Sequence, residues 1–129
     1  MTTTEIGRIG EKIAAKFLKR NGYKILEKNS KQSYNEIDII AADRNYLVFV
    51  EVKTRSVNEE SLYLPYGTPA EAVTRGKQRR TVAAAQSYIY NNKNKHTKKQ
   101  PRMDVIEIYL SKETQKAIKI NHIIDAFGV

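Results

Sequence analysis

Apolar residues recur at helical spacing near the start of the chain. The stripe within residues 4–21 consists of Ile6, Ile9, Ile13 and Phe17. This spacing predicts an amphipathic helix that ends where Asn21-Gly22 supplies a left-handed stop. Gly7 and Gly10 are poor helix formers, so we expect them to mark a close approach by another backbone.

Apolar runs that alternate or are continuous predict five strands farther along the chain. They cover residues 23–29, 35–42, 45–54, 102–110 and 116–123. Residues 28–34 are predicted to form a polar turn region, and Asp43-Arg44-Asn45 a hairpin turn before the third strand. That third run is apolar on both faces, which is typical of a central strand covered on both sides.

A second helix has a clear start signal. Thr68-Pro69-Ala70-Glu71 is a capping box with proline at the first helical position, and the helix is predicted to continue to about Tyr90. Residues 55–67 and 91–101 are predicted loops, and residues 123–127 a short closing element. The order of elements predicts a single α/β domain, 1–129, with a mixed sheet of about five strands flanked by helices.

Charged residues interrupt two of the predicted strands: Glu36 and Asp38 in one, Glu51 and Lys53 in the other. Residues two apart in a strand share a face, so each pair points one way. A charge on a covered face is costly unless it is paired or bound to a metal, and adjacent carboxylates raise each other's pKa. A hard divalent cation with oxygen ligands, such as Mg²⁺ or Mn²⁺, resolves this conflict.

The same residues admit a simpler interpretation. Glu51 and Lys53 at a strand end could form an exposed ion pair that stabilises the fold by less than about 1 kcal/mol. Asp38 on the preceding strand and Glu11 on the first helix favour a site instead. An ammonium group beside a metal-bound water can steady the water or the developing charge, so this set can assemble a phosphodiester hydrolase.

The charge balance points to a polyanionic partner. The chain has 23 Lys and Arg against 14 Asp and Glu, a formal net charge of +9. Such an excess favours contact with phosphate backbones, although solubility alone also explains a basic surface. No apolar run approaches the roughly 20 residues of a membrane helix. The chain has no cysteine and its first residues lack signal-peptide features, so we expect a cytoplasmic protein without membrane contact.

The chain resembles a known group of nucleases. The matching segments are "GRIGEKIAAKFLKRNGYKIL", "NEIDIIA", "LVFVEVKTR", "YGTPAEAV" and "RMDVIEI", which span most of the chain in the same order and spacing. They resemble the PD-(D/E)-x-K superfamily in its archaeal Holliday-junction-resolvase-like branch, and are more closely similar to the YraN family of small endonuclease-like proteins. The resemblance implies a restriction-endonuclease-like fold and a metal-dependent nuclease.

The resemblance also implies roles for individual residues. Asp38 and Glu51 match the metal ligands, together with the backbone carbonyl of Val52 between the two motif residues. Lys53 matches the lysine beside the attacking water. Glu11 matches a helix-borne glutamate of resolvase-like members, so the implied catalytic set is Glu11, Asp38, Glu51 and Lys53. Glu36 precedes the metal-binding aspartate, where it is an outer or auxiliary ligand.

Further auxiliary and binding residues lie elsewhere in the sequence. Lys77 lies in the apolar stripe of the second helix with Gln78 at its edge, and it either reaches the site or, more commonly, snorkels along the sheet. Tyr63 and Tyr66 either stack on unpaired bases or pack the loop down. The predicted contacts to nucleic-acid phosphates, for which a solvated surface is the alternative, are Arg55, Arg75, Arg79, Arg80, Lys98, Lys99 and Arg102.

Two functions from different classes follow. The first is a Mg²⁺-dependent deoxyribonuclease acting on branched or structured DNA. The second is a non-catalytic nucleic-acid-binding module on a nuclease fold, accessory to DNA repair, recombination or uptake. A homodimer is left open, because two cuts in a symmetric junction need two sites related by a two-fold axis.

Overall fold

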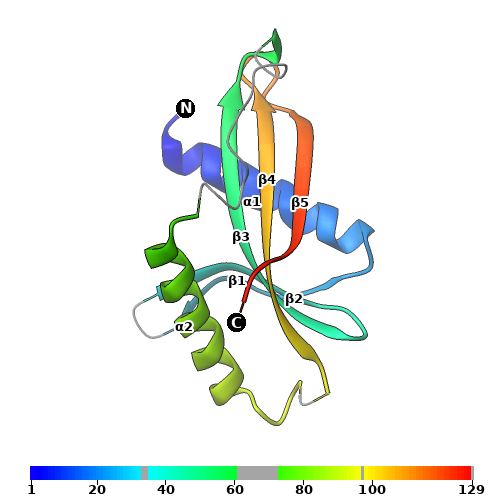
Figure 1. Ribbon diagram of the computed structural model, residues 1–129. Helices are drawn as coiled ribbons and strands as arrows, with labels where there is room; N and C mark the ends of the chain where they lie inside the picture. The colour runs from blue at the N-terminus through cyan, green and yellow to red at the C-terminus, as the bar shows by residue number, and fades with distance from the viewer. Residues whose placement is uncertain (33–34, 61–72, 97, 129) are drawn as a thin grey trace.

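A computed structural model of the chain describes residues 1–32, 35–60, 73–96 and 98–128. It consists of one five-stranded sheet and two helices (Figure 1). The elements are α1 (Thr3–Arg20), β1 (Lys24–Gln32), β2 (Asn35–Ala42), β3 (Tyr46–Val57), α2 (Arg75–Asn91), β4 (Gln100–Ser111) and β5 (Ala117–Phe127). The predicted α/β class, with a mixed sheet flanked by helices, is confirmed.

The sheet has the order β1-β2-β3-β4-β5. Neighbouring strands are antiparallel except β3 and β4, which are parallel and joined through α2. A parallel pair needs such a crossover, because the chain must return to the end of the sheet from which it started. β3 is the central strand, and both of its faces are covered, as the apolar pattern predicts.

The helices cover opposite faces of the sheet. In Figure 1, α1 crosses behind the upper strands, and it packs on a cluster that includes Val48, Val50 and Ile106. α2 packs on a second cluster that includes Leu47 and Phe49. Even and odd residues of β3 therefore face different helices, as alternation along a strand requires. Neither described helix is long and apolar enough to cross a membrane.

The glycines of α1 differ in what surrounds them. A Cβ atom on Gly10 would lie 1.8 Å from the hydroxyl oxygen of Thr54 on β3, whereas a Cβ on Gly7 would meet no described atom within 4 Å. A close approach is therefore found at Gly10, where the neighbour is the Thr54 side chain and not a backbone, and the expectation is wrong for Gly7. Without a side chain at residue 10, α1 lies directly against the central strand and brings the next residue, Glu11, toward the same region.

Several predicted boundaries are wrong. β3 continues to Val57 and β4 begins at Gln100, so strands take up one end of each predicted loop, 55–67 and 91–101. Residues 28–32 continue β1 instead of turning, because their backbone pairs with β2 while their polar side chains suit an edge strand. Residues 123–127 belong to β5. The second helix does not run through residues 73–74, because the extended Thr74 caps α2 by accepting a hydrogen bond from the Lys77 N–H. The predicted capping box at 68–71, Tyr63 and Tyr66 lie outside the described residues.

Candidate active site

The site begins where β2 separates from β3. The two strands are paired from Ile39 with Val50 to Ala42 with Leu47, and the ladder does not continue to Asp38. Beyond this point the Asp38 side chain replaces the backbone as hydrogen-bond acceptor, since its Oδ2 accepts a hydrogen bond from the Val52 N–H at 2.8 Å. We call this place, where the two strands part, the fork. It holds the Asp38 carboxylate against the backbone of β3, one residue beyond Glu51.

Glu51 lies on the α2 face of β3 and is almost fully buried, at 5% exposure. Its Oε1 lies 3.7 Å from the ammonium of Lys53 and 3.7 Å from that of Lys77. Its other oxygen, Oε2, is buried without a hydrogen-bond partner among the described residues. A buried carboxylate oxygen with no partner is costly, so this position favours an additional positive or proton-bearing group.

Both acidic groups are held away from their ordinary ionisation range. Burial, and then the nearby Asp38, raise the pKa of Glu51 to about 7 against the opposing effect of the two lysines. Burial also raises the pKa of Asp38, although the Val52 N–H opposes it. The two side chains are close enough to hydrogen-bond to each other when one carries a proton. They therefore form a pair that a shared proton or cation would neutralise.

The donor set fits a hard cation. Asp38 and Glu51 supply carboxylate oxygens, and one of these oxygens has no hydrogen-bond partner among the described residues. The chain also has no cysteine that could offer a softer thiolate ligand. Within the described part of the chain, no three His, Cys, Asp or Glu side chains are grouped closely enough to hold a metal ion. Mg²⁺ characteristically binds one or two carboxylates and completes its shell with water and substrate phosphates, so two carboxylates suffice.

Glu11 and Glu36 lie beside this pair. Together with Asn29 they line a polar cavity of about 410 Å³ between α1, β1 and β2. Burial, followed by the charge of Asp38, raises the pKa of Glu11, which places Glu11 within electrostatic reach of the pair. The structure thus brings Glu11 and Glu36 to the approach to the site, whereas the direct contacts to Glu51 come from Lys53 and Lys77.

The two auxiliary residues of α2 behave differently. Lys77 reaches Glu51, so the commoner snorkel interpretation is wrong and its side chain belongs to the site. Gln78 does not reach the site, because its Nε2 donates to the carbonyl of Val73 at 2.9 Å. That bond ties the side chain to the residues before the helix. Gln78 therefore supports the start of α2, which in turn positions Lys77.

The predicted phosphate contacts divide into three groups. Arg75, Arg79, Arg80 and Lys98 have exposed side chains, as a surface contact requires. Lys99 donates to the carbonyls of Asp43 and Arg44 and so supports the β2–β3 turn. Arg55 pairs with the fully buried Glu107, with 2.9 Å between Arg55 Nε and Glu107 Oε2.

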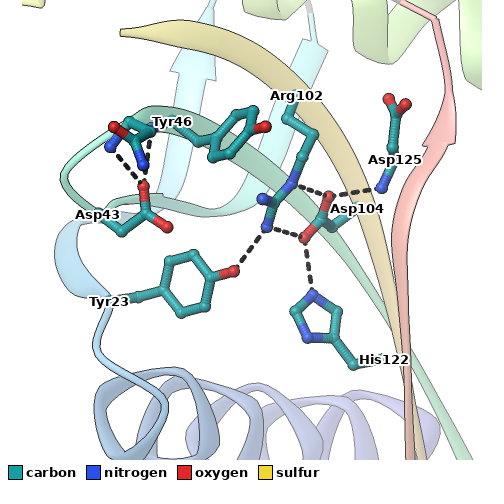
Figure 2. Close-up of polar contacts among 8 residues, drawn as sticks. Tyr23, Asp43, Tyr46, Arg102, Asp104, His122 and Asp125 are labelled. Carbon is teal, nitrogen blue, oxygen red and sulfur yellow. Dashed lines mark hydrogen bonds and ion pairs between the residues drawn. The ribbon is translucent and has the colours of Figure 1, made fainter.

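The prediction for Arg102 is corrected by the structure. Its side chain is buried at 8% exposure, and it donates from Nε and Nη2 to the two oxygens of Asp104, each at 2.8 Å (Figure 2). It also donates to the Tyr23 hydroxyl and lies 4.6 Å from the centre of the Tyr46 ring. A guanidinium held on this many sides is not available to a phosphate.

The sequence gives His122 no partner at metal-ligand spacing. In the structure its Nε2 lies 2.7 Å from Asp104 Oδ2, and its ring packs edge-on against Phe17. The contact comes from the antiparallel pairing of β4 with β5, which no local spacing reveals. The only part of this cluster that the sequence indicates is the Arg102–Asp104 pair, because residues two apart in a strand share a face.

Comparison with known proteins places the chain in a family. The model of "Uncharacterised protein family UPF0102" matches residues 10–108. A UPF0102 protein of Caldanaerobacter subterraneus subsp. tengcongensis is 50% identical over 123 residues, 95% of this chain and 93% of the relative. One from Caldicellulosiruptor saccharolyticus is 39% identical over 127 residues, 98% of this chain and all of the relative.

The family match covers the elements that build the site, from Gly10 at the close approach of α1 to the middle of β4. The relatives extend over nearly the whole chain at high identity. The expected similarity to YraN-type proteins is thereby confirmed, and the chain belongs to the UPF0102 family.

Proposed function

We propose that this protein is a metal-dependent endonuclease of the PD-(D/E)-x-K type that hydrolyses phosphodiester bonds in branched or otherwise structured DNA. The observation that carries the proposal is the buried Oε2 of Glu51, which has no hydrogen-bond partner in the part of the chain that the structure describes. It lies in a carboxylate pair with Asp38, and two ammonium groups stand at the other oxygen. Buried polar atoms without a partner are rare in structural clusters, so this one favours a ligand site.

Each side chain has a distinct task in this proposal. Asp38 and Glu51 would hold Mg²⁺ or Mn²⁺, with the Val52 carbonyl as a further ligand. When bound, the cation supplies a more acidic water and neutralises charge on the phosphate. Glu51 holds the ammonium groups of Lys53 and Lys77 together. Those two groups, each about one-third exposed, can donate hydrogen bonds to a water or to phosphate oxygens.

The choice of DNA as substrate is supported by charge. The net charge of +9 and the exposed arginines of α2 favour a polyanion. We place the activity in the cytoplasm, which suits a chain without cysteine. Paired cuts in a symmetric junction would require two copies of the site, so for that substrate the proposal includes a homodimer.

The test is cleavage of labelled four-way-junction, flap and single-stranded DNA with Mg²⁺, with Mn²⁺ or with a chelator. Cleavage should require the cation, and Asp38→Asn and Glu51→Gln should each reduce its rate by about 100-fold or more, because they remove cation ligands. Asp125→Asn is the control, because it removes an exposed carboxylate of β5 away from the site. Cation-independent cleavage, or equal rates for all four proteins, would contradict the proposal. Binding without cleavage would favour the non-catalytic module.

A further inference from the structure

A second cavity lies on α2, away from the Glu51 site. Its volume is about 580 Å³, and it is bounded by one side of α2 and by the end of β5 at Phe127 and Gly128. In Figure 1 the end of β5 lies beside α2. Ligand-binding clefts typically occupy a few hundred to a thousand Å³, so the cavity is large enough for one nucleotide.

The polar part of the cavity is suited to a phosphate. Arg75 and Arg79, one helical turn apart, both line it, and none of the described residues that line it is acidic. Two like charges at this spacing repel, and cations in the first turns of a helix are also opposed by the helix dipole. α2 has no acidic residue in its first turn to offset them. An anion bound between the two guanidinium groups would remove both unfavourable interactions.

The remaining lining is apolar or amide-bearing. Phe127 is half-buried against the apolar cluster under α2, and Val82 and Ala83 line the same cavity. Gln86 adds an exposed amide at the edge. An aromatic ring beside aliphatic groups is a surface on which a nucleobase stacks, and an amide can hydrogen-bond to the base edge without requiring one sequence.

We infer that this cavity binds one unpaired nucleotide of a DNA strand, with its phosphate on Arg75 and Arg79 and its base against Phe127. The base must be unpaired, because a base inside a duplex cannot reach a concave surface. Lys77 lies between Arg75 and Gln78 in sequence but points to Glu51. α2 would therefore hold a neighbouring nucleotide on one side while it contacts the reaction centre on the other. The inference rests on the proposed function for its DNA substrate but not on catalysis.

The experiment compares two exposed arginines on different helices. Arg79 lines the cavity, whereas Arg20 lies in the last turn of α1, on the opposite face of the sheet. Binding of a fluorescein-labelled 12-nucleotide single strand is measured by anisotropy in chelator, so that no cleavage occurs. Arg79→Gln should weaken binding about 5-fold and lower the salt dependence by roughly 0.7 in slope, and Arg20→Gln should weaken it less than about 2-fold.

A second pair of measurements tests the base. Wild-type protein should bind the normal strand several-fold more tightly than an abasic strand with the same number of phosphates. Ala83→Leu adds bulk to the cavity at an exposed helical position, so it should remove this preference while the melting temperature is retained. Equal effects of Arg79→Gln and Arg20→Gln, or no preference for bases in the wild type, would overturn the inference.

These results are separable from the nuclease proposal. A protein that cleaves nothing but shows the Arg79 and Ala83 effects keeps the nucleotide site and loses the activity. A protein that cleaves with Mg²⁺ but shows neither effect keeps the activity and loses the nucleotide site. A wild type that binds no single strand at all also overturns the site.

Discussion

Two buried carboxylates, Asp104 and Glu51, lie almost side by side in the sheet and are treated in opposite ways. Their strands are paired in register, so that Val50 lies opposite Asp104 and Glu51 opposite Val105. Asp104 accepts hydrogen bonds on both oxygens, from Arg102, from the N–H of Asp125 and at the His122 ring (Figure 2). Glu51 has two ammonium groups near one oxygen, and its other oxygen has no hydrogen-bond partner among the described residues.

The ionisation of the two groups follows this difference. Burial alone would raise the pKa of Asp104, but the hydrogen bonds from His122 and Arg102 lower it below its usual range. Burial raises the pKa of Glu51 to about 7, because its partners do not compensate. Burial is therefore common to both, and the number of satisfied oxygen positions separates a structural carboxylate from one that is ready to bind a ligand.

The largest expected effect on stability comes from disrupting the hydrogen bonds of Asp104 with Arg102 and His122. Asp104→Asn should lower the free energy of unfolding by about 3–5 kcal/mol, because the amide leaves the buried Arg102 unpaired and turns a donor toward other donors. Chemical denaturation at pH 7 measures it. The folded-state pKa of Asp104 is lowered, so this carboxylate contributes stability above its unfolded pKa and loses that contribution as the pH falls through the folded pKa.

Asp125→Asn is the matched control for this variant. Asp125 contributes only its backbone N–H to Asp104, its side chain is exposed, and asparagine tolerates its positive φ of 56°. Its effect should stay within about 0.5 kcal/mol. Equal losses in the two variants would show that the Asp104 side chain does not hold the network together.

Removing the charge of Glu51 should change the free energy of unfolding in the opposite direction. Glu51 has a folded-state pKa of about 7, above its ordinary value of 4.5, so the cation-free folded protein binds a proton that the unfolded chain releases. Its contribution to stability is therefore lost as the pH rises from 4.5 to 7. Glu51→Gln should raise the free energy of unfolding at pH 8 by about 2–3 kcal/mol and have little effect at pH 4. Denaturation of both proteins in chelator across this range tests it, and destabilisation at pH 8 would contradict it.

The smallest expected effect is that of a divalent cation on the intact protein. At several times its dissociation constant, Mg²⁺ or Mn²⁺ should raise the free energy of unfolding by about 1 kcal/mol, because only the folded state presents the carboxylate pair. Thermal unfolding with and without the cation measures the gain. Glu51→Gln should abolish the gain, and Asp125→Asn should retain it. The same gain in all three proteins would place the cation elsewhere.

The alternation of apolar residues predicted the fold well, because alternation directly reflects which face is covered. β2, β3 and the opening helix lie close to their predicted ranges. The edge strand β1 and the end of β5 were underestimated, because polar side chains at an edge look like a turn. The predicted start of α2 is wrong for another reason. Thr74, six residues beyond the predicted cap Thr68, is the N-cap of α2 in the structure.

The site was predictable only where one strand carries it. Glu51 and Lys53 share a face by their spacing alone, and the structure retains that relation. Lys77 and His122 depend on how a helix or a distant strand packs, so their sequence neighbourhood did not reveal their contacts. Arg102 misled for a related reason, because a basic residue at the start of a strand resembles a surface cation until its partners are known.

The fork between β2 and β3 has a consequence for communication within the sheet. The amide proton of Val52 is held by the Asp38 side chain, whereas its neighbours in the ladder bond to backbone. Anything that withdraws electron density from that carboxylate, whether a proton or an ion, loosens this main-chain bond without moving a strand. The charge on Asp38 therefore affects a backbone hydrogen bond of β3 directly. That bond is made by Val52, the residue between Glu51 and Lys53.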